Sequence, residues 1–136
     1  MKLSKVDLVG LKVYVYFNLH KKLFSVKAME GLYKGLVVAH CDSIALQDVT
    51  PKVSQKGRDR VLQEKRKNVH AGLVGHVVLV DIPMVDSEDH KHITYNPYKY
   101  KTFVYTDSEK EYTGSEWVHI SKNQGITTAW KSNRKS

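Results

Sequence analysis

The sequence predicts a mainly β (α+β) domain, a small antiparallel barrel or curved sheet with one inserted helix at about residues 55–68. Apolar and polar side chains alternate over residues 12–20, a long apolar run covers 69–82, and turn residues separate the other apolar stretches. A chain of 136 residues is long enough for one domain with a single core. We therefore expect one β-rich domain over residues 1–130 and a frayed basic tail over 131–136.

The first strands follow from local patterns. The period of two over residues 12–20 is typical of a half-buried strand, because successive side chains point to opposite faces. Lys21 and Lys22 then turn the chain into a second strand around Val26. The apolar stretches that follow predict strands at 36–39 and 44–49.

A single helix interrupts the strands. Ser54 is a plausible N-cap, because its hydroxyl can accept from a free backbone N–H, and residues 58–67 form the body. The apolar stripe of this helix is narrow, so we expect the helix to lie on a sheet. The later strands are expected at 69–82, 93–95, 101–105, 117–120 and 126–130.

The positive charge of the chain is unevenly placed. The net charge is +8. Residues 1–80 carry 14 Lys and Arg against 6 Asp and Glu, whereas residues 81–136 carry 8 of each. Half of those 14 cations fall between Lys52 and Lys67. Such an asymmetry indicates an anionic partner.

The basic helix is the first candidate site. Guanidinium and ammonium groups at this density can hold phosphates through charge-assisted hydrogen bonds. The alternative is a solvated helix stabilised by the pairs Arg60–Glu64 and Glu64–Lys67, a pattern that leaves Lys56, Arg58 and Arg66 without a partner. The candidate ligand-binding residues are Arg58, Arg60, Lys65, Arg66, Lys67, Asn68 and His70.

The polar face of the first strand is the second candidate. This face carries, at every second position, Lys12, Tyr14, Tyr16, Asn18 and His20. Aromatic rings interleaved with cations suit base stacking combined with phosphate contacts. Tyrosines are also ordinary strand residues whose hydroxyls reach water, so the pattern fits a purely structural role as well.

Other side chains suggest chemistry less directly. His70 and His76, six positions apart, would face the same side of a strand. With Arg66 and Asn68 they could line a pocket, either as ligand donors or as an acid/base pair. The acidic loop 86–92 contains carboxylate and imidazole groups without a recognised metal spacing. The lone Cys41 is expected to be buried, and no cofactor-binding motif is present.

The location follows from what the sequence lacks. It has no signal peptide and no apolar run of about 20 residues, so we expect a cytoplasmic protein without membrane contact.

Two family resemblances follow from short motifs. The segments 92–95 and 119–121 resemble the histidine–apolar–hydroxyl motif of two-histidine phosphoesterases, although only 27 positions separate their histidines. The runs KVYVYFNLHKK, VVAH and EKRKNVHA, within roughly residues 10–80, resemble small bacteriophage accessory proteins. This second resemblance implies expression in a bacterial host, where such proteins act on host immunity by capturing nucleotide signals or blocking nucleic-acid enzymes.

The leading hypothesis is a phage-encoded, non-enzymatic binding protein that sequesters a nucleotide immune signal. The first alternative is a nucleic-acid-binding protein that uses the same basic surface. The second is a phosphodiesterase or nuclease built on His70 and His76 or on His92 and His119. The expected partner is an anionic nucleotide or a nucleic acid. The sequence also leaves open an acidic host protein and a second subunit that completes the pocket.

Overall fold

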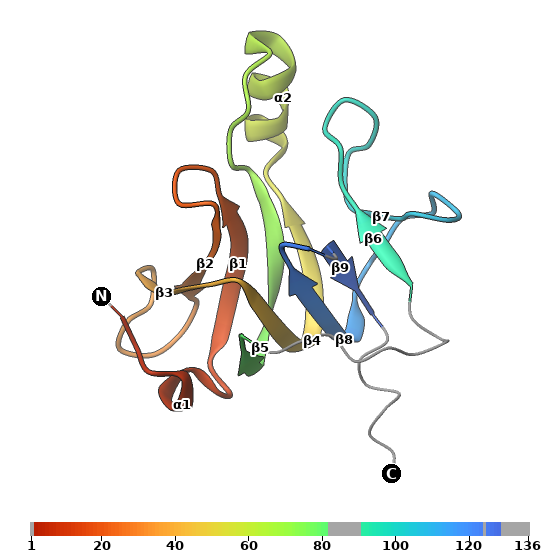
Figure 1. The fold of residues 1–136 in the computed structure, drawn as a ribbon. Coiled ribbons are helices and arrows are strands. Elements are labelled where there is room, and N and C mark those ends of the chain that lie inside the picture. The colour runs from red at the N-terminus through yellow and green to blue at the C-terminus, as the bar shows by residue number, and fades with distance from the viewer. Residues whose placement is uncertain (1, 82–90, 124, 129–136) are drawn as a thin grey trace.

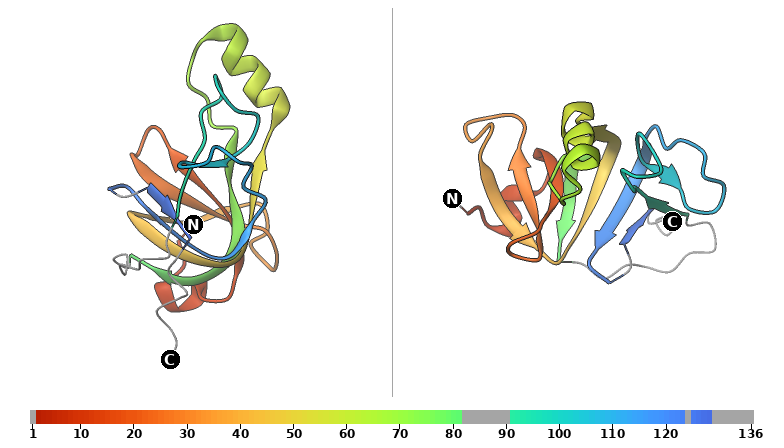
Figure 2. Two further views of the ribbon diagram at one scale, coloured as in Figure 1. Left: turned by 90° about the vertical axis from the view of Figure 1, so that its right-hand side faces the viewer. Right: turned by 90° about the horizontal axis from the view of Figure 1, so that it is seen from above.

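The computed structural model describes residues 2–81, 91–123 and 125–128, and these form one antiparallel sheet of nine strands. The strand order is β3-β2-β1-β5-β4-β8-β9-β6-β7. The sheet is strongly curved but its two edge strands do not pair, so the predicted curved sheet is confirmed and a closed barrel is not formed (Figures 1 and 2). The mainly β fold class is therefore confirmed.

The elements match most of the sequence-based expectations. A short helix, α1, precedes the sheet, and Ser4 caps it by accepting a hydrogen bond from the backbone of Asp7. This helix was not predicted. The bounds are α1 Lys5–Leu8, β1 Lys12–Asn18, β2 Leu23–Ala28, β3 Val37–Cys41, β4 Ser43–Val53, α2 Gln55–Glu64, β5 Ala71–Val80, β6 His92–Thr94, β7 Val104–Tyr105, β8 Ser115–Ser121 and β9 Gly125–Thr127.

The two faces of β1 set the inside and the outside of the sheet. Val13 and Val15 are almost fully buried, whereas Tyr14 and Tyr16 between them are half-buried. The predicted alternation is thus confirmed. We call the face that carries Val13 and Val15 the core face and the opposite one the outer face.

The core face holds one apolar cluster contributed by nearly every strand. Its fully buried members include Leu46, Leu73, Tyr112 and Val118. Cys41 belongs to the same cluster with 3% of its surface exposed, as expected for a packing residue. Burial raises the pKa of the Cys41 thiol to about 12, so this side chain is neutral at physiological pH.

A helical arm, residues 54–70, extends from the paired strands β4 and β5. The backbone N–H of Ser54 donates to the carbonyl of His70 at 2.8 Å and closes the base of the arm. Ser54 also caps α2 as predicted, because its hydroxyl accepts from Gly57 N at 3.1 Å. The helix ends at Glu64, earlier than expected, since Lys65 adopts a left-handed conformation with φ 57° and turns the chain back toward β5.

The orientation of the arm differs from the expectation. The predicted helix was expected to lie on the sheet, but α2 stands beyond the ends of β4 and β5 (Figure 1). Its neighbour is the loop between β6 and β7, residues 95–103, which rises beside it (Figure 1). None of the helices in the described ranges is long and apolar enough to cross a membrane.

Candidate functional site

A groove of about 590 Å³ lies where the arm, the end of β1 and the β6–β7 loop meet. The arm contributes Lys67, Asn68 and His70 to its lining, and the loop contributes Tyr95 and Tyr98. Phe17, Leu19, Val61, Val69 and Pro97 supply apolar walls, and Asn96 supplies a second amide. This mixture of aromatic rings, amides and one cation is typical of a small-molecule site, and the volume lies in the usual range.

A hydrogen-bonded chain fixes the ring of His70 in the wall of the groove. Its Nδ1 lies 2.7 Å from the carbonyl oxygen of Asn68, and its Nε2 lies 2.6 Å from the hydroxyl of Tyr95. Because a carbonyl oxygen only accepts, Nδ1 carries a proton and donates to Asn68. Both nitrogens of His70 are therefore engaged within the protein.

Tyr95 lies at the centre of an aromatic cluster. Its ring is 5.4 Å from the His70 ring, edge to face, and 5.2 Å from the Phe103 ring. Desolvation raises the pKa of the Tyr95 hydroxyl, an effect that the charge of Arg58 partly offsets. The hydroxyl thus stays protonated and available as a hydrogen-bond donor.

Gly57 allows the arm to close on itself. A Cβ at this position would lie 2.5 Å from Cβ of His70. The first turn of α2 therefore packs directly against the segment that carries His70, which sets the position of that ring.

Arg58 connects α2 to the β6–β7 loop. Its Nε donates to the carbonyl of Tyr100 at 2.9 Å, and Gln55 Nε2 donates to the carbonyl of Lys101 at the same distance. Arg58 therefore has a protein partner that the sequence did not reveal. It positions one wall of the groove and does not line it.

Replacing Arg58 by alanine is expected to speed amide hydrogen exchange in residues 96–101 by roughly tenfold, because one charge-assisted hydrogen bond to Tyr100 is lost. The matched control is Arg60→Ala, which removes an exposed arginine from the same helix. Equal exchange rates in the two variants would contradict the positioning role of Arg58. Hydrogen–deuterium exchange by mass spectrometry measures both.

A second cavity of about 370 Å³ lies deeper on the core face. It shares Phe17, Ala71, Thr94 and Tyr95 with the groove, so the two spaces are adjacent. Its walls are mostly apolar, and Lys122 lies at its margin.

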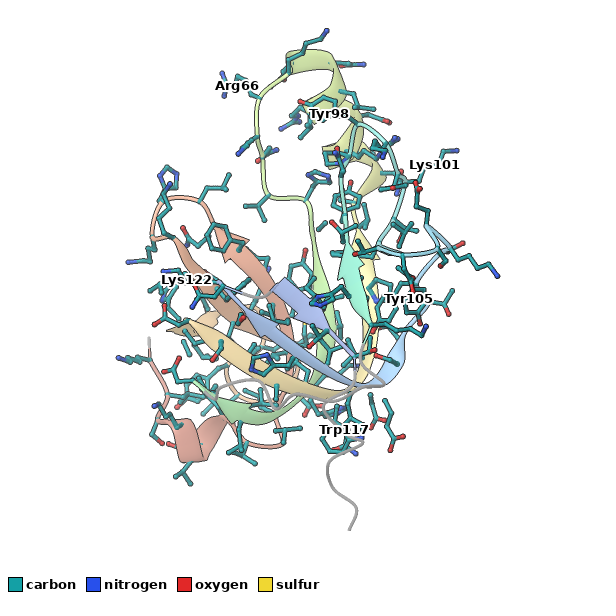
Figure 3. The ribbon with its side chains drawn as sticks, turned by 45° about the vertical axis from the view of Figure 1, so that its right-hand side comes forward. Arg66, Tyr98, Lys101, Tyr105, Trp117 and Lys122 are labelled. Carbon is teal, nitrogen blue, oxygen red and sulfur yellow. The ribbon has the colours of Figure 1, made fainter. Side chains whose placement is uncertain are left out.

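The remaining cations of the arm do not gather at the groove. Arg60, Lys65 and Arg66 are exposed. In the view of Figure 3, Arg66 and Tyr98 lie on opposite sides of the returning segment of the arm. Of the predicted basic residues only Lys67 lines the groove, so the structure disperses most of the charge that the sequence concentrates.

The predicted residues of β1 are also separated from the groove. Tyr14 and Tyr16 alternate with the buried valines of β1 and do not line the groove, although Tyr16 is among the residues that line the second cavity. The Asn18 side chain donates to Ser25 Oγ and accepts from the backbone of His20 and Lys21, which closes the β1–β2 turn. His20 is exposed in that turn.

The structure does not bring His76 to His70, and it gives His92 and His119 very different exposure. His76 lies on β5, paired with Lys12 and Gln47, and is not part of the groove that contains His70. His92 and His119 are both in register with Thr127 across β9, but His119 has no exposed surface whereas His92 is exposed.

The acidic segment 86–92, which has no recognised metal spacing, is described only in part. Its residues 86–90 lie outside the described residues. No group of three or more possible metal ligands occurs within the described ranges.

Sequence reasoning missed the residues that the β6–β7 loop brings to the groove. Tyr95 and Tyr98 flank the Asn96-Pro97 pair, and Asn96 itself also lines the groove. From the sequence, Asn96-Pro97 indicates only a turn between two strands. The cluster of two tyrosines and an amide around one proline was the available signal.

The fold and the groove define a class of protein, namely a small, mainly β protein whose open sheet carries a ligand-sized groove under a helical arm. Residues 8–128 match the family described as Mycobacterium phage L5 gene 82 protein. The chain is also 36% identical over 126 residues to the gene 82 protein of Mycobacterium phage L5, which covers 88% of this chain and 96% of that protein.

The chain therefore belongs to the Mycobacterium phage L5 gene 82 protein family. This confirms the expected relation to small phage proteins, and the match extends well beyond residues 10–80. No solved structure matches the chain.

Proposed function

We propose that this phage protein is a binding protein that holds a nucleotide in the groove without converting it. The observation that carries the proposal is the convergence of Lys67, Asn68 and His70 from the arm with Tyr95 and Tyr98 from the β6–β7 loop. These two segments are distant in sequence, and Arg58 and Gln55 hold them together. The result is a preorganised site, which lowers the entropic cost of binding.

Each lining group suits one part of a nucleotide. The rings of Tyr95, Tyr98 and Phe17 offer stacking surfaces for a base, and the amides of Asn68 and Asn96 match the donors and acceptors of its edge. Lys67 provides a cation for a phosphate, and the two exposed cations that precede it, Lys65 and Arg66, add positive charge to the arm. The adjacent apolar cavity would offer space for a second base of a dinucleotide.

The contacts of His70 are consistent with a holding role. Its Nε2 lies 2.6 Å from the hydroxyl of Tyr95, so this nitrogen would have to give up that contact before it could take a proton from a ligand. In a phage protein, a bound and unconverted nucleotide is withheld from host receptors. The proposal therefore includes counter-defence in the cytoplasm of the bacterial host.

Isothermal titration calorimetry with mononucleotides, cyclic mononucleotides and cyclic oligonucleotides tests the proposal, with inorganic phosphate as a reference. We expect one nucleotide class to bind with a stoichiometry near one per chain and to be recovered unchanged by chromatography. Two results would overturn it: no binding by any nucleotide at millimolar concentration, or recovery of a cleaved product.

A further inference from the structure

We propose that the outer face of β1, β2, β4 and β5 is a second binding surface, one for single-stranded nucleic acid. Tyr14 and Tyr16 would stack on bases there, and Lys27 and Lys52 would contact the backbone phosphates. Neither tyrosine lines the groove, and both alternate along β1 with the groove residue Phe17, so their side chains point to the opposite face of that strand. Tyr16 also contributes to the wall of the second cavity. It does not depend on the proposed function of the groove.

The strand register brings the four side chains to one face. Tyr14 is paired with Lys27 on β2 and with Val74 on β5. Lys52 on β4 is paired with Gly72, two residues before Val74 on the same strand. Residues two apart on a strand share a face, so the lysines flank the two rings on either side (strands in Figure 1).

The two rings form a fixed platform. Their centroids are 5.6 Å apart with an interplanar angle of 34°, and Nζ of Lys52 lies 5.8 Å from the centroid of the Tyr14 ring. Gly72 supplies the space for the Tyr14 ring, since a Cβ at that position would lie 2.8 Å from one of its carbons. The ring is therefore held in place before any ligand arrives.

The charge around the platform also favours a polyanion. None of the outer-face positions that the register places beside Tyr14 and Tyr16 on the described strands is a carboxylate. Glu30 and Asp48 lie at the margin, where Glu30 accepts from the backbone of Lys12 and Asp48 occupies a bulge of β4. Desolvation raises the pKa of the Tyr14 hydroxyl, so the ring is uncharged and does not repel phosphate.

Aromatic rings beside lysines on an open sheet bind single strands with little sequence preference, because every base has a face that can stack. The four side chains are spread over β1, β2 and β4, so a strand of several nucleotides can contact more of them than a single nucleotide can. We therefore expect affinity to rise with strand length and to fall steeply with salt.

Fluorescence anisotropy with a labelled thymidine oligomer of about 12 nucleotides tests the proposal. The double variant Tyr14→Leu/Tyr16→Leu is expected to lower the affinity by about tenfold or more, and Tyr14→Phe/Tyr16→Phe to keep it. Lys27→Gln/Lys52→Gln is expected to reduce the slope of log affinity against log salt by about 1.4, whereas Lys56→Gln/Lys110→Gln, which changes two exposed lysines elsewhere, should leave it unchanged.

Tyr98→Leu is the matched control for the two sites, because it removes a tyrosine from the groove only. It is expected to weaken nucleotide binding and to leave oligomer binding unchanged, and circular dichroism confirms that each variant is folded. The proposal is wrong if the oligomer does not bind at low salt, or if the Tyr14/Tyr16 leucine variant binds as tightly as the parent. A loss caused by Tyr98→Leu alone would place the oligomer in the groove and overturn the proposal as well.

Discussion

Replacing Lys67 by glutamate is expected to weaken nucleotide binding to the groove by roughly a hundredfold. Lys67 is the one residue of the predicted basic cluster that lines this space in the described structure. The substitution removes a charge-assisted contact to phosphate and places a like charge beside it, and each change costs affinity. Isothermal titration calorimetry with the nucleotide that binds the parent protein measures the effect.

The matched control for Lys67→Glu is Lys56→Glu. Both variants change the net charge by the same amount, but Lys56 is exposed and does not line the groove. If the arm attracts phosphate only through its total charge, the two variants will lose the same affinity. That result would remove Lys67 from the site and favour a diffuse electrostatic surface.

Replacing Tyr112 by alanine is expected to lower the free energy of unfolding by about 3–5 kcal/mol. Tyr112 has no exposed surface, and its ring meets the Tyr105 ring edge to face at 5.6 Å. Its hydroxyl lies 2.6 Å from Oγ of Ser115. The alanine variant leaves a cavity where the buried ring was, and the cost is a large part of the stability of a small domain. Urea unfolding measures this change in the free energy of unfolding.

Tyr112→Phe separates the ring from the hydroxyl and is expected to cost only about 1 kcal/mol. Burial raises the pKa of Tyr112 to about 12, above the value of about 10 in an unfolded chain. The parent protein should therefore lose stability as pH rises from about 10 toward 12, and the phenylalanine variant should lose less. If Tyr112→Ala and Tyr112→Phe lower the free energy of unfolding by the same amount, the packing of the ring contributes little.

Most of the secondary structure could be predicted because its signals are local. The alternation along β1, the apolar run of β5 and the capping Ser54 each depend on a few consecutive residues. The early end of α2 could not be predicted, because Lys65 adopts a positive φ without the usual glycine or asparagine. Nor does the pattern show that β5 lies between β1 and β4, since alternation identifies a face and not a neighbour.

The sequence predicted only the part of the candidate site that comes from one short segment of the chain. Lys67, Asn68 and His70 are close in sequence, and the structure brings them together in the groove. Tyr95 and Tyr98 come from a segment more than 20 positions away, and contacts such as Arg58–Tyr100 and Gln55–Lys101 place them opposite the arm. Tyr14 and Tyr16 were assigned to the same ligand because they are aromatic and near cations, but one strand cannot direct them and Phe17 to the same side.

The closure at the base of the arm has a consequence for how relatives diverge. β4 and β5 stay paired up to Val53 and Ala71, and the bond from Ser54 to His70 seals the insertion at its root. We therefore expect that residues 55–69 can change in length or composition while the pairing of β4 and β5 beneath them is preserved. A relative with a different arm would then keep the same sheet and present a different wall to the groove.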